Sequence, residues 1–218
     1  MDIKNKIEAI IFDMDGVLFD TESLYLKSWI KVFKKYGYTM EKEIYLDVMG
    51  TGRENVKKVF KEKFGDNLPI EEMYKEKDIE LFKEIEENLE VKDGVLELLT
   101  YLKENNYKIA LATSGERIRM EKQMKKANFI KFFDALVTKE DVNKNKPNPD
   151  IFLKAAEKIN VEPKKCMVIE DSFAGIKGAY LGNMIPVHVI DLKELDEEGK
   201  KLCYKTYKNL IELKGELF

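Results

Sequence analysis

Short apolar runs alternate with helical patterns along most of the chain. The apolar runs span residues 7–12, 107–113, 133–137, 166–169 and 185–190. Between them, apolar positions recur with the spacing of amphipathic helices over residues 94–104, 116–127, 149–159 and 174–181. Strands that alternate with such helices form βαβ units, so the pattern predicts an α/β fold with a doubly wound, Rossmann-like parallel sheet. Further on, it predicts a polar surface segment over 191–201 and a closing helix over 207–213.

The segment after the first apolar run breaks this alternation. Leu26, Trp29 and Phe33 form one apolar helix face, and further helical patterns cover residues 40–48, 53–64 and 70–87. A segment of this length is too long to be a loop in a compact domain. We therefore expect an inserted helical domain at residues 18–91 within a core of residues 1–17 and 92–218, with hinges near 16–21 and 87–93.

Charge narrows the classes of function. The 218 residues include 38 basic and 41 acidic ones, a net charge of −3, whereas dedicated nucleic-acid binders carry a basic excess. We therefore expect no nucleic-acid partner. Lysines supply nearly all of the positive charge. The few arginines are better candidates for contacts with anions; they are Arg53, Arg117 and Arg119.

Few residues offer thiol or imidazole chemistry. Cys166 and Cys203 have no metal-like spacing, and the one histidine, His188, lies in an apolar run where a strand residue is expected. The N-terminus lacks the apolar core of a signal peptide. No apolar stretch approaches the ~20 residues that span a bilayer. We expect a cytoplasmic protein without a membrane partner.

Polar residues follow four of the predicted strands. In chain order these residues are Asp13 and Asp15, then Thr113 and Ser114, then Lys146, then Glu170 and Asp171. Ligands of open parallel sheets bind beyond the carboxyl ends of the strands, so we expect these side chains to share one rim. Crowded carboxylates raise one another's pKa values, and a Mg²⁺ ion with oxygen ligands relieves that repulsion. The lysine, the hydroxyl and nearby backbone N–H groups then suit a phosphate.

This set of groups can carry out phosphoryl transfer. One carboxylate can attack phosphorus and form an aspartyl phosphate. A second carboxylate, two residues further on, can protonate the leaving oxygen and afterwards activate water. Each residue also has an ordinary structural explanation, such as a turn or a helix cap. Their occurrence at four strand ends in order is what favours the chemical interpretation.

The segment 13–22, Asp-Met-Asp-Gly-Val-Leu-Phe-Asp-Thr-Glu, resembles the first signature motif of the haloacid dehalogenase (HAD) superfamily of phosphotransferases. Thr113, Lys146 and the pair Glu170-Asp171 match its later motifs in order. The helical insert resembles the cap of the subgroup that contains phosphoglycolate phosphatase and β-phosphoglucomutase. The resemblance implies a Rossmann-like core with an inserted α-helical cap domain, acting as a monomeric Mg²⁺-dependent enzyme on a small phosphorylated metabolite.

The resemblance also implies a role for each matching residue. Asp13 would be the nucleophile and Asp15 the general acid and base. Mg²⁺ would be bound by the Asp13 side chain, the Asp15 carbonyl and Asp171, with Glu170 assisting. The phosphate-binding residues would be Thr113, Ser114 and Lys146. Arg53 and Tyr25 are the candidate substrate contacts in the cap.

A phosphosugar mutase is the main alternative to a phosphatase. The Gly50-x-x-Arg53 motif and the run from Lys146 to Phe152 resemble β-phosphoglucomutase. However, Tyr25 stands where the mutase has a histidine on its first cap helix, and Gly115-Glu116-Arg117 stands where it has Ser-Lys-Asn. A mutase must protect its aspartyl phosphate from water and a phosphatase need not, so these departures favour hydrolysis of a sugar phosphate or short phospho-acid.

Two further classes share part of the pattern. Signalling receiver domains also combine acidic residues, a phospho-accepting aspartate, a hydroxyl and a lysine on a doubly wound sheet, but they need no helical insert. A non-catalytic binding module is the other alternative, because fold does not fix function. Both are remote, since neither explains the whole set of motifs.

Overall fold

The computed structural model describes residues 6–49 and 51–218 and divides into two compact units. One unit runs to Asp20 and resumes at Val91, and the other comprises residues 21–90. Gly50, the first residue of the Gly50-x-x-Arg53 motif, lies outside the described residues.

The first unit is built on a parallel sheet. Its strands within the described residues are β1 (Ala9–Phe12), β2 (Lys108–Ala112), β3 (Ala135–Val137), β4 (Cys166–Glu170), β5 (Ile185–Val189) and β6 (Lys205–Tyr207). Their spatial order is β3-β2-β1-β4-β5-β6, and each neighbouring pair is parallel. The order reverses at β1, which confirms the predicted doubly wound sheet.

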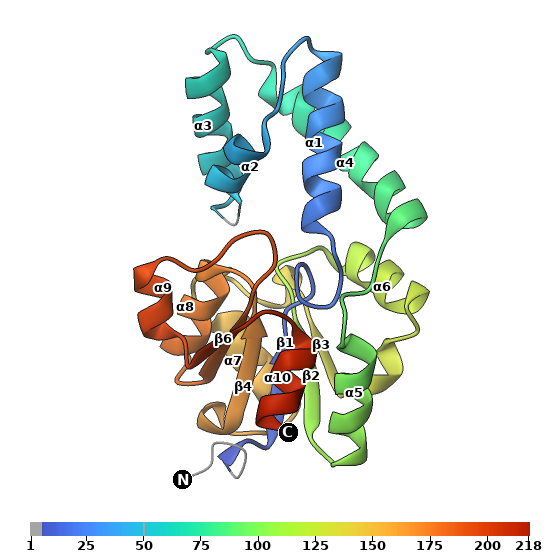
Figure 1. The fold of residues 1–218 in the computed structure, drawn as a ribbon, viewed down its shortest axis with the longest axis vertical. Coiled ribbons are helices and arrows are strands. Elements are labelled where there is room, and N and C mark those ends of the chain that lie inside the picture. Colours follow the sequence, from blue (N-terminus) through green and yellow to red (C-terminus); the bar gives the residue numbers. More distant parts are fainter. Residues whose placement is uncertain (1–5, 50) are drawn as a thin grey trace. The chain divides into compact units, whose positions relative to one another are not determined.

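Helices cover both faces of this sheet (Figure 1). They are α5 (Val95–Glu104), α6 (Arg117–Lys126), α7 (Asp150–Lys158), α8 (Phe173–Leu181), α9 (Glu197–Leu202) and α10 (Leu210–Leu217). Ala9 and Ile11 pack in one buried cluster with α7 and α8 residues, so the alternate residues Ile10 and Phe12 face the opposite side. All four β1 side chains are buried, as expected for a parallel strand covered on both faces.

The C-terminal part of the core differs from the sequence prediction in two places. Helix α9 lies partly within the segment 191–201 that was expected to be a polar surface stretch. Tyr207 ends strand β6, and the closing helix begins three residues later, at Leu210. The sequence pattern missed β6 because two of its three residues are exposed, so the strand contains no apolar run.

The second unit is helical, as predicted for the insert. Within the described residues it contains α1 (Glu22–Lys35), α2 (Lys42–Val48), α3 (Arg53–Phe64) and α4 (Ile70–Asn88). Helices α1 and α4 run side by side (Figure 1). The ring of Trp29 lies 5.2 Å from that of Phe60 and 4.8 Å from that of Tyr74, centroid to centroid. These edge-to-face contacts join α1, α3 and α4 into one core.

The first connection between the units begins later than the predicted boundary after residue 17. The Leu18 N–H donates to the Met14 carbonyl at 3.0 Å, and the Gly16 N–H donates to the Phe19 carbonyl at 2.9 Å. Phe19 also forms a bridge with Val91 and stacks on Phe129. These contacts hold Leu18, Phe19 and Val91 in the first unit, whose first segment ends at Asp20. None of the described helices combines the length and apolar character needed to cross a bilayer.

Candidate active site

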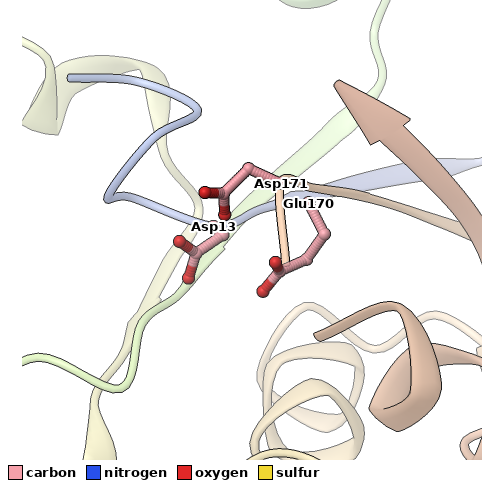
Figure 2. Close-up of side chains that lie close together, drawn as sticks. All are labelled: Asp13, Glu170 and Asp171. Carbon is pink, nitrogen blue, oxygen red and sulfur yellow. The ribbon is translucent and has the colours of Figure 1, made fainter. Parts of the chain in front are cut away.

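Three buried carboxylates meet where the strand order reverses. Asp13 directly follows β1, Glu170 ends β4, and Asp171 follows it. One oxygen of each carboxylate lies within 4.8 Å of the others, and Figure 2 shows the three groups gathered in one small volume. The Asp13 N–H donates to the Ile169 carbonyl at 3.0 Å, which fixes the two strand ends against each other. His188 is buried in β5 as predicted, with Nε2 3.1 Å from the Asp171 carbonyl oxygen.

The glycine of the first motif makes room for Asp171. Gly16 has φ +76, in the left-handed region that favours glycine. A Cβ atom at this position would lie 2.3 Å from Asp171 Oδ2. Any larger residue would therefore displace the carboxylate, so Gly16 is required both by its backbone conformation and by close approach.

Lys146 lies between two of the carboxylates. Its loop, which precedes α7, places Nζ 2.5 Å from Asp13 Oδ1 and 2.6 Å from Glu170 Oε1. Nζ also donates to the Ala112 carbonyl at 3.0 Å. The lysine side chain is 7% exposed, and those of Asp13 and Glu170 are 9% and 1% exposed. Burial alone would lower the pKa of Lys146, but the charges of Asp13 and Glu170 raise it above its usual range.

The acidic charge exceeds what this lysine balances. The pKa of Asp13 is raised to about 7, chiefly by burial and also by the charges of Glu170 and Asp15, although Lys146 opposes them. Carboxylate oxygens are the ligands that Mg²⁺ prefers. The group Asp13, Glu170 and Asp171 could therefore bind a divalent metal ion, and it fits one on charge and donor type.

The other predicted phosphate ligands follow β2. Thr113 is buried, and its N–H donates to the Val137 carbonyl at 3.0 Å. Its Oγ1 accepts a hydrogen bond from the Gly115 N–H at 3.0 Å. Ser114 is exposed. The strand thus ends in a tight polar turn beside β1.

Sequence reasoning assigned no role to Arg119, although it singled out the arginines. Arg119 lies near the start of α6, and its Nη1 and Nη2 atoms lie 2.9 and 2.5 Å from the two carboxylate oxygens of Asp15. Arg117 and Glu116 are paired elsewhere. Arg117 Nη2 lies 2.5 Å from Asp141 Oδ2, and Glu116 Oε1 lies 3.0 Å from Lys139 Nζ.

The helical unit contains two cations that contact one aromatic ring. The exposed Arg53 begins α3, with its guanidinium carbon 4.4 Å from the ring centroid of Tyr74. Lys77 on α4 is buried, and its Nζ lies 5.4 Å from the same ring and 5.0 Å from that of Tyr25. Sequence reasoning missed Lys77, although it lies four residues before Leu81 and three after Tyr74 on the apolar face of α4.

Comparison with known proteins gives consistent matches. A family model described as haloacid dehalogenase-like hydrolase matches residues 10–188. A phosphorylated carbohydrates phosphatase of Thermotoga maritima is 34% identical over 216 residues, covering 97% of this chain and 100% of the relative. β-Phosphoglucomutase of Bacillus subtilis is 30% identical over 190 residues, covering 84% of this chain and 83% of the relative. The crystal structure of β-phosphoglucomutase from Clostridium difficile has a TM-score of 0.76 at 29% identity, covering 96% of this chain and 94% of that chain.

Replacing Asp13 with asparagine should stabilise the metal-free protein above neutral pH. The pKa of Asp13, about 7 in the folded chain, lies above its ordinary value of 3.8, so ionisation favours the unfolded chain. The free energy of unfolding should therefore fall as the pH rises from about 4 to about 7. In thermal melts with a chelator, Asp13→Asn should have a higher Tm than the wild type at about pH 8. The difference in Tm should become smaller as the pH falls toward about 4.

A matched control should respond in the opposite direction. The pKa of Asp134 is lowered because the Ile109 N–H and Lys103 stabilise its charge, although burial opposes them. Asp134→Asn should therefore lower Tm at about pH 8. An Asp13→Asn variant that melts below the wild type at this pH would show that the ionised carboxylate is not destabilising.

Proposed function

The chain belongs to the haloacid dehalogenase-like hydrolases, and from this membership we propose that it is a Mg²⁺-dependent phosphatase of a small phosphorylated metabolite. The substrate class is a sugar phosphate or a short phospho-acid. The observation that carries the proposal is the buried contact of Lys146 with Asp13 and Glu170, at the strand ends where Asp171 also lies. This contact combines a nucleophile, a phosphate-binding cation and metal ligands in one volume.

The residues present fit the metal. Asp13, Asp171 and the Asp15 carbonyl would hold Mg²⁺, with Glu170 assisting. When bound, the ion supplies positive charge that offsets the charges of the carboxylates and the phosphate. Lys146 and Thr113 bind phosphoryl oxygens, and the burial of Lys146 strengthens its attraction for them.

The reaction takes place in two steps at phosphorus. An Asp13 oxygen attacks, the bond to the ester oxygen breaks, and the Asp15 carboxyl gives its proton to the departing alcohol. Water then attacks the aspartyl phosphate while the Asp15 carboxylate takes a proton from it. The bond between phosphorus and the Asp13 oxygen breaks, inorganic phosphate leaves, and both aspartates return to their starting states.

A mutase is the second candidate, because β-phosphoglucomutase of B. subtilis is 30% identical to this chain. Two observations favour hydrolysis. Tyr25 stands where that enzyme class has a histidine, and it lies against Lys77. Arg117 is paired with Asp141 and Glu116 with Lys139, so Arg117 is engaged by a carboxylate rather than available to a second phosphate. Both features weaken protection of the phosphoenzyme from water.

One assay separates the two reactions. The enzyme is incubated with β-glucose 1-phosphate, Mg²⁺ and a trace of the 1,6-bisphosphate, and inorganic phosphate and glucose 6-phosphate are measured together. A parallel panel of sugar phosphates and short phospho-acids finds the preferred substrate. In the assay with β-glucose 1-phosphate, inorganic phosphate should be released faster than glucose 6-phosphate forms. Formation of glucose 6-phosphate much faster than phosphate release would establish the mutase instead.

The Asp13→Asn variant should lose turnover, because an amide cannot form the aspartyl phosphate. Loss of a nucleophile lowers the rate by on the order of 10⁴–10⁶-fold. Phosphate release from an aryl phosphate measures this loss, and the thermal melts described above show that the variant is folded. More than a few per cent of residual activity would exclude Asp13 as the nucleophile.

Chelation should abolish activity, and Mg²⁺ should restore it. Ca²⁺ should restore little, because it prefers more ligands at longer distances. Activity is measured in EDTA and after titration with each ion, and circular dichroism in EDTA checks that the metal-free chain stays folded. Full activity in EDTA would remove the metal from the proposal.

We further propose that the helical unit acts as a cap and that Arg53 binds an anionic or hydroxyl-bearing part of the substrate. Arg53→Ala should raise KM for the preferred metabolite far more than for a small aryl phosphate. Lys58→Ala is the matched control, because Lys58 lies on the same helix and is highly exposed. Equal changes for both substrates would place Arg53 outside substrate recognition.

A further inference from the structure

Arg119 makes a two-pronged contact with Asp15. The guanidinium atoms Nη1 and Nη2 lie 2.9 Å from Oδ1 and 2.5 Å from Oδ2. The Arg119 side chain is 9% exposed and that of Asp15 is 18% exposed. Such a planar fork fixes both the position and the rotation of a carboxylate, which a single ammonium cannot do.

The turn after β2 is shaped around this guanidinium. A Cβ atom at Gly115 would lie 2.5 Å from Arg119 Nη2 and 3.2 Å from Thr113 Oγ1. Gly115 does not have the positive φ seen at Gly16, so space rather than backbone conformation requires glycine here. The turn that positions Thr113 thus also admits Arg119 to Asp15.

Asp15 is the more exposed partner of this pair. Its side chain is partly exposed, and it follows the buried Met14 in a loop beyond the end of β1. Arg119 and Asp15 both belong to the first unit. This contact with the carboxylate therefore lies within the first unit.

We propose that Arg119 is a positioning residue that holds the Asp15 carboxylate in the orientation for proton transfer. The inference rests on the proposed function, in which Asp15 first protonates the leaving alcohol and then takes a proton from the attacking water. The positioning of Asp15 also bears on whether the phosphoenzyme is hydrolysed or passes its phosphoryl group to a sugar. A base held by a contact within the first unit is in place for water when the phosphoenzyme forms.

The aspartyl phosphate should accumulate when Arg119 is removed. The ester 4-nitrophenyl phosphate needs little help from a general acid, because nitrophenolate is a good leaving group. Its phosphoryl group should therefore still be transferred quickly to Asp13. Attack by water still needs the base, and misplacing a catalytic group slows a step by about 10²-fold. Rapid mixing of Arg119→Ala with this ester should give a burst of about one nitrophenolate per enzyme, followed by slow turnover. Intact-mass spectrometry of the quenched enzyme should show the added phosphoryl group.

Chemical rescue separates positioning from a structural role. Guanidinium at millimolar concentration, too dilute to unfold the chain, should restore much of the slow turnover of Arg119→Ala, and an alkylammonium of similar size should restore less. Arg119→Lys keeps the charge but not the fork, so it should also accumulate phosphoenzyme; it replaces Arg119→Ala if that variant does not fold. Lys125→Ala is the matched control, because Lys125 lies on the same helix, is exposed and has no part in the proposed site. It should show neither the burst nor the rescue.

The outcomes distinguish a failure of the positioning role of Arg119 from a failure of the proposed phosphatase function. If the wild type does not turn over, or Asp13→Asn still does, the proposed function fails. If the wild type hydrolyses the ester through a phosphoenzyme while Arg119→Ala shows neither accumulation nor rescue by guanidinium, only the positioning role fails. If Arg119→Ala lost the same rate with aryl and alkyl phosphates and accumulated no phosphoenzyme, Arg119 would likewise have only a structural role.

Discussion

Lys146 contacts two buried carboxylates at the point where the sheet changes direction, and the rest of the site depends on that arrangement. Moving a charged group out of water costs several kcal/mol unless a partner and hydrogen bonds compensate it. Lys146 provides the partner for Asp13 and Glu170, and the Ala112 carbonyl accepts a further hydrogen bond from it. Asp171 adds a third carboxylate to the cluster. Burial raises the pKa of Asp13 most, and the charges of Glu170 and Asp15 add to the effect. The excess negative charge also suits the site to a divalent cation.

In the proposed function, the first unit would provide the chemistry common to phosphate esters, and the helical unit would provide contacts that select among substrates. Asp13, Asp15, Lys146 and Asp171 all belong to the core. The helical unit contributes Arg53, Lys77 and the aromatic residues around them. The comparisons match both a carbohydrate phosphatase and a phosphoglucomutase. The same core chemistry is compatible with either outcome, so the contacts of Asp15, Tyr25 and Arg117 are where the two activities would separate.

Several features of the fold could be predicted from the local pattern of apolar and polar residues. The strands from β1 to β5 are buried apolar runs, and the insert shows helical spacing. Strand β6 was missed because its residues are mostly exposed. Residues 18 and 19 were expected in the insert, because their hydrogen bonds with residues 14 and 16 leave no trace in the polarity pattern. Arg119 was visible as a rare arginine, but its partner Asp15 lies 104 positions away.

Residue type and order were enough to predict a doubly wound core, an inserted helical unit and the candidate acids and lysine. This is possible because strand burial and motif spacing are properties of consecutive residues. Only the tertiary structure decided which charges touch. The contacts of Lys146 with Asp13 and Glu170, of Arg119 with Asp15, and of Arg117 with Asp141 join residues 24 to 133 positions apart. The reason is physical: a charged side chain pairs with whatever the packed strands and helices bring within a few ångströms, and that depends on the whole fold rather than on neighbours in sequence.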